Sequence, residues 1–468
     1  MAKFLMSLNA LVWGAPALLL ILGVGLFYSL RLSFFQLRFL PRAFRLFFAG
    51  QKEDNQGTSP FRALCTALAA TVGTGNIVGV AGAICLGGPG AIFWMWVSGV
   101  LGMITKYAEV VLSCHFRVRT KTGWAGGPMY VMTRGLGQAF RPMAWLYSLF
   151  GLIAAFGVGN AAQVNALVTG VHSVLALFGK TPDRTGDVIL GILLAAAIGT
   201  LLLGGAKRIG AAAEMLVPIL CAGYIGLCIL VLVLRAEAIP AAFSAILEGA
   251  FCPRAATGGF LGSAFTALRV GCSRGVFTNE AGMGTAAMAH ASADLRHPAE
   301  QGLLGCLEVF LDTILICSLT ALVILTSGVN ISYGVDAGGT LTSAAFTAVC
   351  GKAAAVFLAI AMALLALATV LGWGLYGGRC AEFLFGSGAW KPFALAQGAA
   401  ALLGTLTDTA AVWRFSETVN GLMAVPNLIT LAVLSPVVIR LTKEYLRKSG
   451  GQAAKGGTYA DFHQRQPL

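Results

Sequence analysis

The sequence predicts an all-α polytopic membrane protein, and two observations carry this prediction. Hydrophobic residues make up 57% of the 468 residues and charged residues only 11%, whereas soluble domains carry about 25% charged residues. Apolar stretches of roughly 20 residues, the length at which a helix spans a bilayer, recur along the whole chain. We therefore expect a single transmembrane domain over residues 1–468, with no soluble domain on either side.

Eleven transmembrane helices are expected from the apolar stretches. They lie at 9–33, 62–84, 90–115, 143–175, 187–205, 212–234, 259–289, 301–327, 350–385, 389–407 and 416–440. The first stretch is longer than the roughly 7–15 apolar residues of a signal peptide, and its basic residues follow it rather than precede it. We therefore interpret it as a retained extra helix at the N-terminus.

Lysine and arginine residues in the loops predict the orientation, because they favour the cytoplasmic side of a membrane. With the 34–61 loop in the cytoplasm, roughly 22 of the 32 basic residues fall on that side. The expected location is the cell (inner) membrane. This orientation places the N-terminus on its outer side and the C-terminal tail, 441–468, in the cytoplasm. The net charge of +13 comes largely from these loops, and no basic patch interleaved with aromatic residues indicates nucleic-acid binding.

The number of helices after the first predicts an internal repeat. Ten remain, which divide into two sets of five, at 62–234 and 259–440. Because five is odd, the second set must cross the membrane in the direction opposite to the first. Inverted repeats of this kind are typical of secondary transporters, in which glycine-broken helices at matching positions of the two halves form the binding site.

The first helix of each predicted half carries such a glycine-rich interruption. The sequences are "TVGTGNIVG" at 71–79 and "RVGCSRGVFTNEAGMGTA" at 269–286. Glycine costs a helix roughly 1 kcal/mol relative to alanine, and freed peptide groups at membrane depth are tolerated only inside protein or along a cavity. We assign Gly79 and Gly82 to close helix packing and the stretch 73–76 to a site.

The freed peptide groups of the first interruption suit two kinds of ligand. N–H groups at the start of a half-helix bind anions, so Thr74 and Gly75 are candidates for a substrate carboxylate. Carbonyl groups on the other side of a break coordinate cations. The carbonyls of Thr71 and Val72 and the side chain of Asn76 are therefore candidate cation ligands.

Ionisable residues within the predicted spans are candidates for structural or gating roles. Lys106 and Glu109 are three residues apart near a cytoplasmic helix end, where they are expected to pair with each other. Glu308 and Asp312 are four apart and share a helix face, which is expected to turn toward Arg269 or Arg274. An ion pair is favoured here over a proton relay, which stays open as an alternative.

Two further polar positions lie at membrane depth. Glu280, beside Asn279 in the second interruption, is expected to hold Arg274 or the N-terminus of a neighbouring half-helix, behind the residues that contact substrate. Gln163 and Asn165 place amide groups on a third helix, where a buried amide needs a partner. A ligand amine or carboxylate is one such partner.

Other function classes are less well supported by the residues. "GCSRG" at 271–275 matches the G-x-S-x-G pattern of hydrolases, which requires a strand before the serine and a distant His and Asp, and no strand is expected here. A base within reach of a nucleophile is not found at membrane depth, so an enzyme is not expected. A channel requires rings of charges or carbonyls about an axis, unlike one asymmetric pair of broken helices.

Several long motifs resemble one known family. They are "GTGNIVGVAGAICLGGPGAIFWMWVSGVLG" (73–102), "GGPMYVMTRGLG" (126–137), "RGVFTNEAGMGTAAMAHASA" (274–293), "LEVFLDTILICSLTALVIL" (307–325) and "NGLMAVPNLI" (420–429). The chain is similar in these motifs to the alanine or glycine:cation symporters, also called sodium:alanine symporters. The resemblance implies a leucine-transporter-type fold of five plus five inverted helices with one extra helix in front.

The resemblance also implies a function. Members of this family carry alanine or glycine into the cell with Na⁺ by alternating access, without an organic cofactor. H⁺ coupling, or a larger substrate such as glutamine, is the alternative within transport. Membrane lipid and the small amino acid are the expected partners, and a monomer is the working expectation.

The resemblance assigns site residues by their place in the motifs. The substrate-binding residues would be Thr74, Gly75, Asn76, Gln163, Gly275, Phe277, Thr278 and Trp373, with Trp373 as the wall that keeps the pocket small. A Na⁺ site would use the carbonyls of Ala69 and Val72 and the hydroxyl of Thr369. The family usually has Ser-Thr where this chain has Ala368 and Thr369, so one hydroxyl ligand is absent.

Overall fold

The computed structural model describes residues 12, 14–48, 57–120, 123–181, 183–251, 264–294, 296–335, 338–406 and 409–450. The described residues are mostly helical, as predicted. Their one sheet is the short antiparallel pair β1 (Val118–Thr120) and β2 (Gly123–Ala125), in which Val118 lies opposite Ala125.

The helices described up to residue 251 include several that continue into or out of π-helical segments. They are α2 (Ala15–Arg31), α3 (Phe35–Arg38), α4 (Leu40–Phe48), α5 (Pro60–Thr71), α6 (Val80–Gly87), α7 (Gly90–His115), α8 (Pro128–Val131), α9 (Arg141–Phe156), α10 (Ala162–Leu177), α11 (Arg184–Leu203), α12 (Gly205–Leu234) and α13 (Ile239–Phe251). The π-helical segments are Gly75–Gly79, Met132–Leu136 and Gly157–Ala161.

The remaining helices follow from residue 264 onward. They are α15 (Ala264–Asn279), α16 (Ala286–His290), α17 (Pro298–Val309), α18 (Ser318–Thr326), α19 (Gly338–Cys350), α20 (Lys352–Phe385), α21 (Trp390–Leu406), α22 (Thr409–Val433) and α23 (Ser435–Gly450). The π-helical segment Phe310–Cys317 joins α17 to α18. Single 3₁₀ turns lie at Gln138–Phe140, Ala236–Ala238 and Ser387–Ala389.

Length and composition identify several membrane-crossing helices. Within the described ranges six are long and apolar enough to cross a membrane, and up to eight if each of two bent pairs is one span. The shorter apolar helix Pro16–Arg31 lies within the first predicted span. The expected total of eleven stays a prediction.

The last predicted span, 416–440, is wrong at its C-terminal boundary. The helix ends at Val433, and the chain bends by 61° into α23. α23 carries Arg440, Lys443, Glu444 and Arg447 within its turns, and such residues are costly inside the hydrocarbon. The structure also contains helices α3 and α4 where the sequence suggested a loop, and of the predicted tail it describes only 441–450, which is helical.

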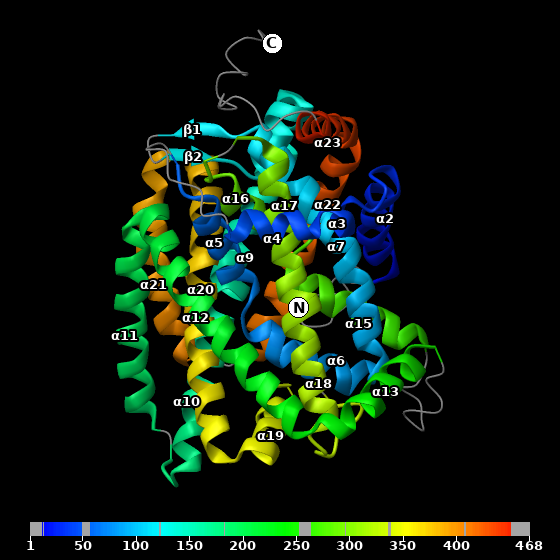
Figure 1. The fold of residues 1–468 in the computed structure, drawn as a ribbon. Coiled ribbons are helices and arrows are strands. Elements are labelled where there is room, and N and C mark those ends of the chain that lie inside the picture. Colours follow the sequence, from blue (N-terminus) through cyan, green and yellow to red (C-terminus); the bar gives the residue numbers. More distant parts are fainter. Residues whose placement is uncertain are drawn as a thin grey trace.

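The helices differ in how deeply they are buried, and α7 is central. In α7, 83% of an apolar stretch of 18 residues is buried inside the protein. The corresponding share is 22% in α11 and in α12. Outer helices instead expose large apolar side chains such as Leu193, Met215 and Val233, as expected for surfaces that face lipid. Figure 1 shows α11 and α21 side by side at one edge, with β1, β2 and α23 at one end of the bundle and α13 and α19 at the other.

The two glycine-rich interruptions break their helices as predicted. α5 begins at a capped N-terminus, where Ser59 Oγ accepts the N–H of Arg62, and it ends at Thr71. The following helix, 75–87, is inclined to α5 by 52°. In the second half α15 ends at Asn279 and α16 begins at Ala286, with left-handed backbone at Glu280, Gly282 and Gly284.

α17 begins beside a neutral histidine. The Nδ1 atom of His297 accepts the N–H of Ala299 at 3.1 Å and so caps the first turn of the helix. Burial, together with the charge of Lys448, lowers the pKa of His297 to about 4. The imidazole is therefore unprotonated at neutral pH, which leaves Nδ1 free to accept.

The close approach of α15 to α7 depends on glycine, which gives a first prediction. A Cβ at Gly271 would lie 2.2 Å from the Ala91 carbonyl oxygen, so Gly271→Ala should destabilise the fold by about 1–3 kcal/mol. A lower unfolding temperature of the purified protein would show this. Gly226→Ala is the matched control, because a Cβ there has no neighbour within 4 Å, and equal unfolding temperatures for the two variants would contradict the prediction.

Candidate functional site

At the first helix break, two backbone N–H groups do not donate to their usual helical carbonyls. The N–H of Gly73, which would bond to the Ala69 carbonyl in a continued helix, donates to Asn76 Oδ1 at 3.0 Å. The N–H of Asn76 donates to the Gly73 carbonyl at 3.3 Å instead of the Val72 carbonyl. The break therefore diverts the usual donors of the Ala69 and Val72 carbonyls, the two predicted cation ligands.

A small cavity lies between the two breaks. It is lined from the first broken helix, from the π-helical segment and helix that follow α9, from the end of α15, and from α20 and α22. The lining residues are Ala70, Thr71, Gly73, Thr74, Gly75, Val158, Gln163, Phe277, Thr278, Glu280, Thr369, Trp373 and Asn420. Segments far apart in the sequence thus share one small internal space.

Most of the predicted substrate residues meet at this cavity. Six of the eight line it, namely Thr74, Gly75, Gln163, Phe277, Thr278 and Trp373. Thr74 Oγ1 donates to Gln163 Oε1 at 3.0 Å, and Gln163 Nε2 donates to the Val158 carbonyl at 3.2 Å. These contacts tie the first break to the predicted span 143–175 and fix the amide of Gln163 beside the cavity.

The two other predicted substrate residues lie elsewhere. A Cβ at Gly275 would lie 2.2 Å from Ser98 Oγ, so this glycine packs against α7 and its predicted place at the pocket is wrong. Asn76 is not a lining residue either. Its Nδ2 atom donates to Asp312 Oδ1 at 2.6 Å, so Asn76 links the break to α17 and its π-helical continuation.

The predicted cation ligands gather beside Gly73. The Oγ1 atom of Thr369 is buried and has no hydrogen-bond partner, and it would lie 2.6 Å from a Cβ at Gly73. It therefore lies beside the first break as a buried hydroxyl without a partner. By contrast, Thr71 Oγ1 already donates to the Ala67 carbonyl at 3.2 Å.

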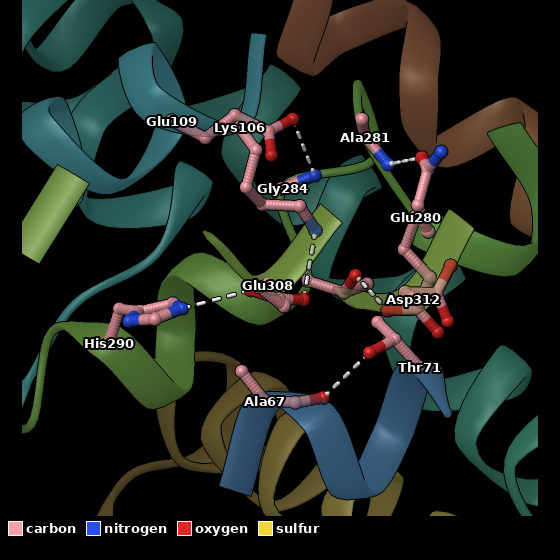
Figure 2. A network of polar contacts seen from close by, with 12 residues as sticks. Ala67, Thr71, Lys106, Glu109, Glu280, Ala281, Gly284, His290, Glu308 and Asp312 are labelled. Atoms are coloured by element: carbon pink, nitrogen blue, oxygen red, sulfur yellow. Dashed lines mark hydrogen bonds and ion pairs between the residues drawn. The ribbon is translucent and has the colours of Figure 1, made fainter. Parts of the chain in front are cut away.

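A cluster of buried charges lies next to this site, around Lys106 (Figure 2). Lys106 Nζ lies 3.5 Å from Glu308 Oε1, and both side chains are fully buried. His290 Nε2 lies 2.9 Å from Glu308 Oε2, and Gln301 Nε2 contacts His290 Nδ1 at 2.7 Å. The expected pairing of Lys106 with Glu109 is wrong, because α17 rather than the next turn of α7 faces the lysine.

Glu109 accepts hydrogen bonds from the backbone of the second helix break. Its Oε1 atom accepts the N–H of Gly282 at 2.8 Å and the N–H of Gly284 at 3.0 Å. Asn427 Nδ2 donates to the same oxygen at 2.7 Å. A carboxylate from α7 thus replaces the carbonyl partners that these two peptide groups lose when α15 ends.

The expected direction of Glu308 and Asp312 toward Arg269 or Arg274 is wrong. Glu308 pairs with Lys106 and His290, as above. Asp312 accepts from Asn76 and, at 2.8 Å, from Thr313 Oγ1. The two carboxylates share a helix face as predicted, but that face packs against α7 and the first break.

Several residues of the cavity were not predicted from the sequence or were predicted to lie elsewhere. Glu280, expected behind the site, lines the cavity, and its carboxylate accepts from the Thr285 hydroxyl. Val158 and Asn420 also line it and were not singled out. Asn420 could have been predicted from the sequence, because it is the first residue of the motif "NGLMAVPNLI" and carries an amide within a predicted span.

Comparison with known proteins assigns the chain to a family. The sequence profile of the sodium:alanine symporter family matches residues 1–458. The chain belongs to the sodium:alanine symporter family. It is therefore a membrane symporter and not an enzyme.

Relatives of the chain match over nearly their whole length. A sodium/alanine symporter, AgcS of Methanococcus maripaludis, is 42% identical over 457 residues, which are 96% of this chain and 98% of the relative. An uncharacterized transporter of Haemophilus influenzae is 42% identical over 95% of this chain and 96% of its own. A Bacillus subtilis protein named as a probable sodium/glutamine symporter, GlnT, is 36% identical over 94% of this chain and 90% of the relative.

A solved structure shows the fold of this symporter. The crystal structure of MhsT in complex with L-phenylalanine has a TM-score of 0.57 with this chain at 14% identity, and covers 83% of this chain and 99% of its own. MhsT has the leucine-transporter fold. At this identity the likeness concerns the fold alone.

The lysine at the centre of the charge cluster gives a second prediction. Removing one partner of a buried ion pair leaves the other charge uncompensated, at a cost of about 3–5 kcal/mol. Lys106→Met should therefore strongly lower the unfolding temperature and the yield of monodisperse protein. The double variant Lys106→Met/Glu308→Met removes both charges and should be less destabilised than Lys106→Met alone. A double variant at least as unstable as the single one would contradict the ion-pair assignment.

Proposed function

We propose that this symporter couples Na⁺ entry to the uptake of alanine or glycine. The observation that supports this most directly is one small cavity lined by residues of both broken helices, with the unpartnered hydroxyl of Thr369 among its lining groups. The AgcS relative is named as a sodium/alanine symporter, which agrees with Na⁺ and alanine. Glutamine is a second candidate substrate because the GlnT relative bears that name, and H⁺ is the alternative coupling ion.

The substrate carboxylate is proposed to bind at the start of the helix over 75–87. The N–H groups of Thr74 and Gly75 lie there beside the cavity, and the helix dipole favours an anion at this end. Phe277, Thr278 and Trp373 would enclose the short side chain. Because one methylene changes binding by only about 1–3 kcal/mol, exclusion of larger amino acids requires a rigid wall, which Trp373 provides.

Na⁺ is proposed to bind between the Ala69 and Val72 carbonyls and the Thr369 hydroxyl. The Thr71 carbonyl is a further candidate ligand, while its hydroxyl donates within α5. Asn76 would act through Gly73 and Asp312 rather than as a direct ligand. Ion and substrate would then meet on opposite sides of the same helix break, so that the binding of each stabilises the arrangement that the other needs.

Transport is proposed to follow alternating access between two inverted sets of five helices, with the extra helix outside the repeat and eleven spans in all. The N-terminus would lie outside and the tail inside. The packing of Arg42 over the Tyr445 ring supports this orientation, since it brings two basic segments, α4 and α23, to one side of the membrane. A lipid-embedded monomer is the form that we propose, without an organic cofactor.

Uptake into proteoliposomes tests the proposed function. Labelled alanine, glycine and glutamine would be offered with a Na⁺ gradient, a Li⁺ gradient or a pH gradient alone. We expect Na⁺-dependent uptake of alanine and glycine, and none in Gly75→Leu, whose side chain would fill the cavity beside Thr278. Gly75→Ala is the matched control, because its Cβ would meet Thr278 Cγ2 at an ordinary 3.4 Å. Uptake driven by the pH gradient alone would contradict Na⁺ coupling.

The indole wall gives a prediction on specificity. Trp373→Ala should extend uptake to larger neutral amino acids such as leucine, at a cost in stability of about 3–5 kcal/mol. Competition of unlabelled leucine with labelled alanine measures the effect. Trp390→Ala, which removes an indole outside the cavity lining, is the control for destabilisation. The assignment fails if both variants retain the substrate range of the unmodified protein.

The missing hydroxyl at the proposed Na⁺ site gives a prediction on the ion. Ala368→Ser should lower the Na⁺ concentration for half-maximal uptake by roughly tenfold, since a contact with a charged group contributes about 1.5 kcal/mol or more. Ala366→Ser, two residues away on the same helix and equally buried, is the control. An unchanged half-saturation in Ala368→Ser would remove this position from the ion site.

A further inference from the structure

We propose that Glu280, assisted by Asn420, binds the ammonium group of the transported amino acid and so selects amino acids over other small carboxylic acids. This inference rests on the proposed function and deepens it. It concerns the half of a zwitterionic substrate that the first helix break leaves without a partner. The N–H groups at Thr74 and Gly75 suit a carboxylate, but they repel rather than bind a cationic ammonium.

An ammonium group taken into a membrane protein requires acceptors. Burying a charged group without a partner costs several kcal/mol or more. Among the residues that line the cavity, Glu280 is the one acidic side chain, and the other lining side chains are neutral. The substrate cavity therefore contains a carboxyl group that carboxylate recognition does not explain.

The second helix break holds Glu280 at the cavity. The residue follows the end of α15 with a left-handed φ of 54°, a conformation that costs a non-glycine residue roughly 1–3 kcal/mol. Glu109 holds the N–H groups of Gly282 and Gly284 directly after it, which fixes the turn. The Thr285 hydroxyl binds one carboxylate oxygen, Oε2. The turn thus maintains a strained backbone that places a carboxylate beside the site.

The surrounding charges leave Glu280 in need of a counter-ion. Lys106 is the cation of a cluster that also contains the carboxylates of Glu109, Glu280, Glu308 and Asp312, and every member is at most 4% exposed. The ammonium of Lys106 lies against Glu308 rather than Glu280. A substrate ammonium would supply the positive charge that the cavity face of this cluster lacks.

Asn420 provides a second polar group at the same cavity. It lies on α22, is 1% exposed and lines the cavity together with Glu280. Its Oδ1 atom is buried and accepts no hydrogen bond, although buried amide oxygens normally have a partner. A carboxylate and an amide oxygen together would accept two of the three ammonium hydrogens.

Binding competition between three ligands tests this proposal. Displacement of labelled L-alanine from the purified protein at constant Na⁺ would be measured with L-alanine, L-lactate and propionate. Lactate has a hydroxyl in place of the ammonium group, and propionate has neither. The unmodified protein should bind alanine far more tightly than either acid, and equal affinities for alanine and lactate would overturn the proposal without any variant.

Glu280→Gln separates recognition of the ammonium group from general support of the site. It should weaken alanine binding roughly 30-fold or more, as expected when one partner of a desolvated charge pair is lost, while lactate affinity stays the same or increases. Asn420→Leu should show a smaller loss of the same kind. Glu280→Asp, which keeps the charge, should recover part of the preference for alanine. Glu214→Gln, at a half-buried ion pair with Arg62 outside the cavity, is the matched control.

The outcomes distinguish this proposal from the proposed function. If Glu280→Gln weakens alanine and lactate binding equally, the residue only supports the turn and the proposal is overturned. Unchanged alanine affinity would overturn it as well. If the unmodified protein binds no alanine at any Na⁺ concentration, the proposed function fails instead.

Discussion

Every peptide group that leaves a helix inside this protein needs a new partner, and this constraint organises the site. A membrane interior offers no water to satisfy a freed N–H or carbonyl group. At the first break Asn76 accepts the N–H of Gly73, and at the second break Glu109 accepts the N–H groups of Gly282 and Gly284. The Ala69 and Val72 carbonyls, whose usual helical donors are diverted, are the ones that we propose as Na⁺ ligands.

α7 carries much of this support although it lines no part of the cavity. It supplies Glu109 to the second break and Lys106 to the pair with Glu308, and Gly271 and Gly275 allow α15 to pack closely against it. The central and most deeply buried of the long apolar helices therefore carries two charges whose partners come from other helices. Their burial is tolerated because each finds an opposite charge or several hydrogen-bond donors.

The arrangement connects the two proposed ligands through short contacts. Asn76 bonds to the break at Gly73 and also to Asp312, while Thr369 and Trp373 on α20 reach the ion and substrate sides of the same break. A shift of the first broken helix against α7, α15 and α17 would thus alter both subsites together. Membership of the sodium:alanine symporter family agrees with a site in which two ligands depend on one backbone interruption.

The sequence by itself determined that the chain folds into apolar helices and where two of them break. Hydropathy and the glycines of "TVGTGNIVG" and "VGCSRGVFTNEAGMG" act locally, so the breaks near 72–75 and 280–285 could be predicted without knowing any neighbour. Motif resemblance placed Thr74, Gln163 and Trp373 at one cavity. Only the tertiary structure decided the partners of the ionisable residues: Lys106 meets Glu308 rather than Glu109, Glu280 lines the cavity, and Gly275 packs away from it. Such pairings depend on the rotation of each helix toward its neighbours, which spacing along one helix does not contain.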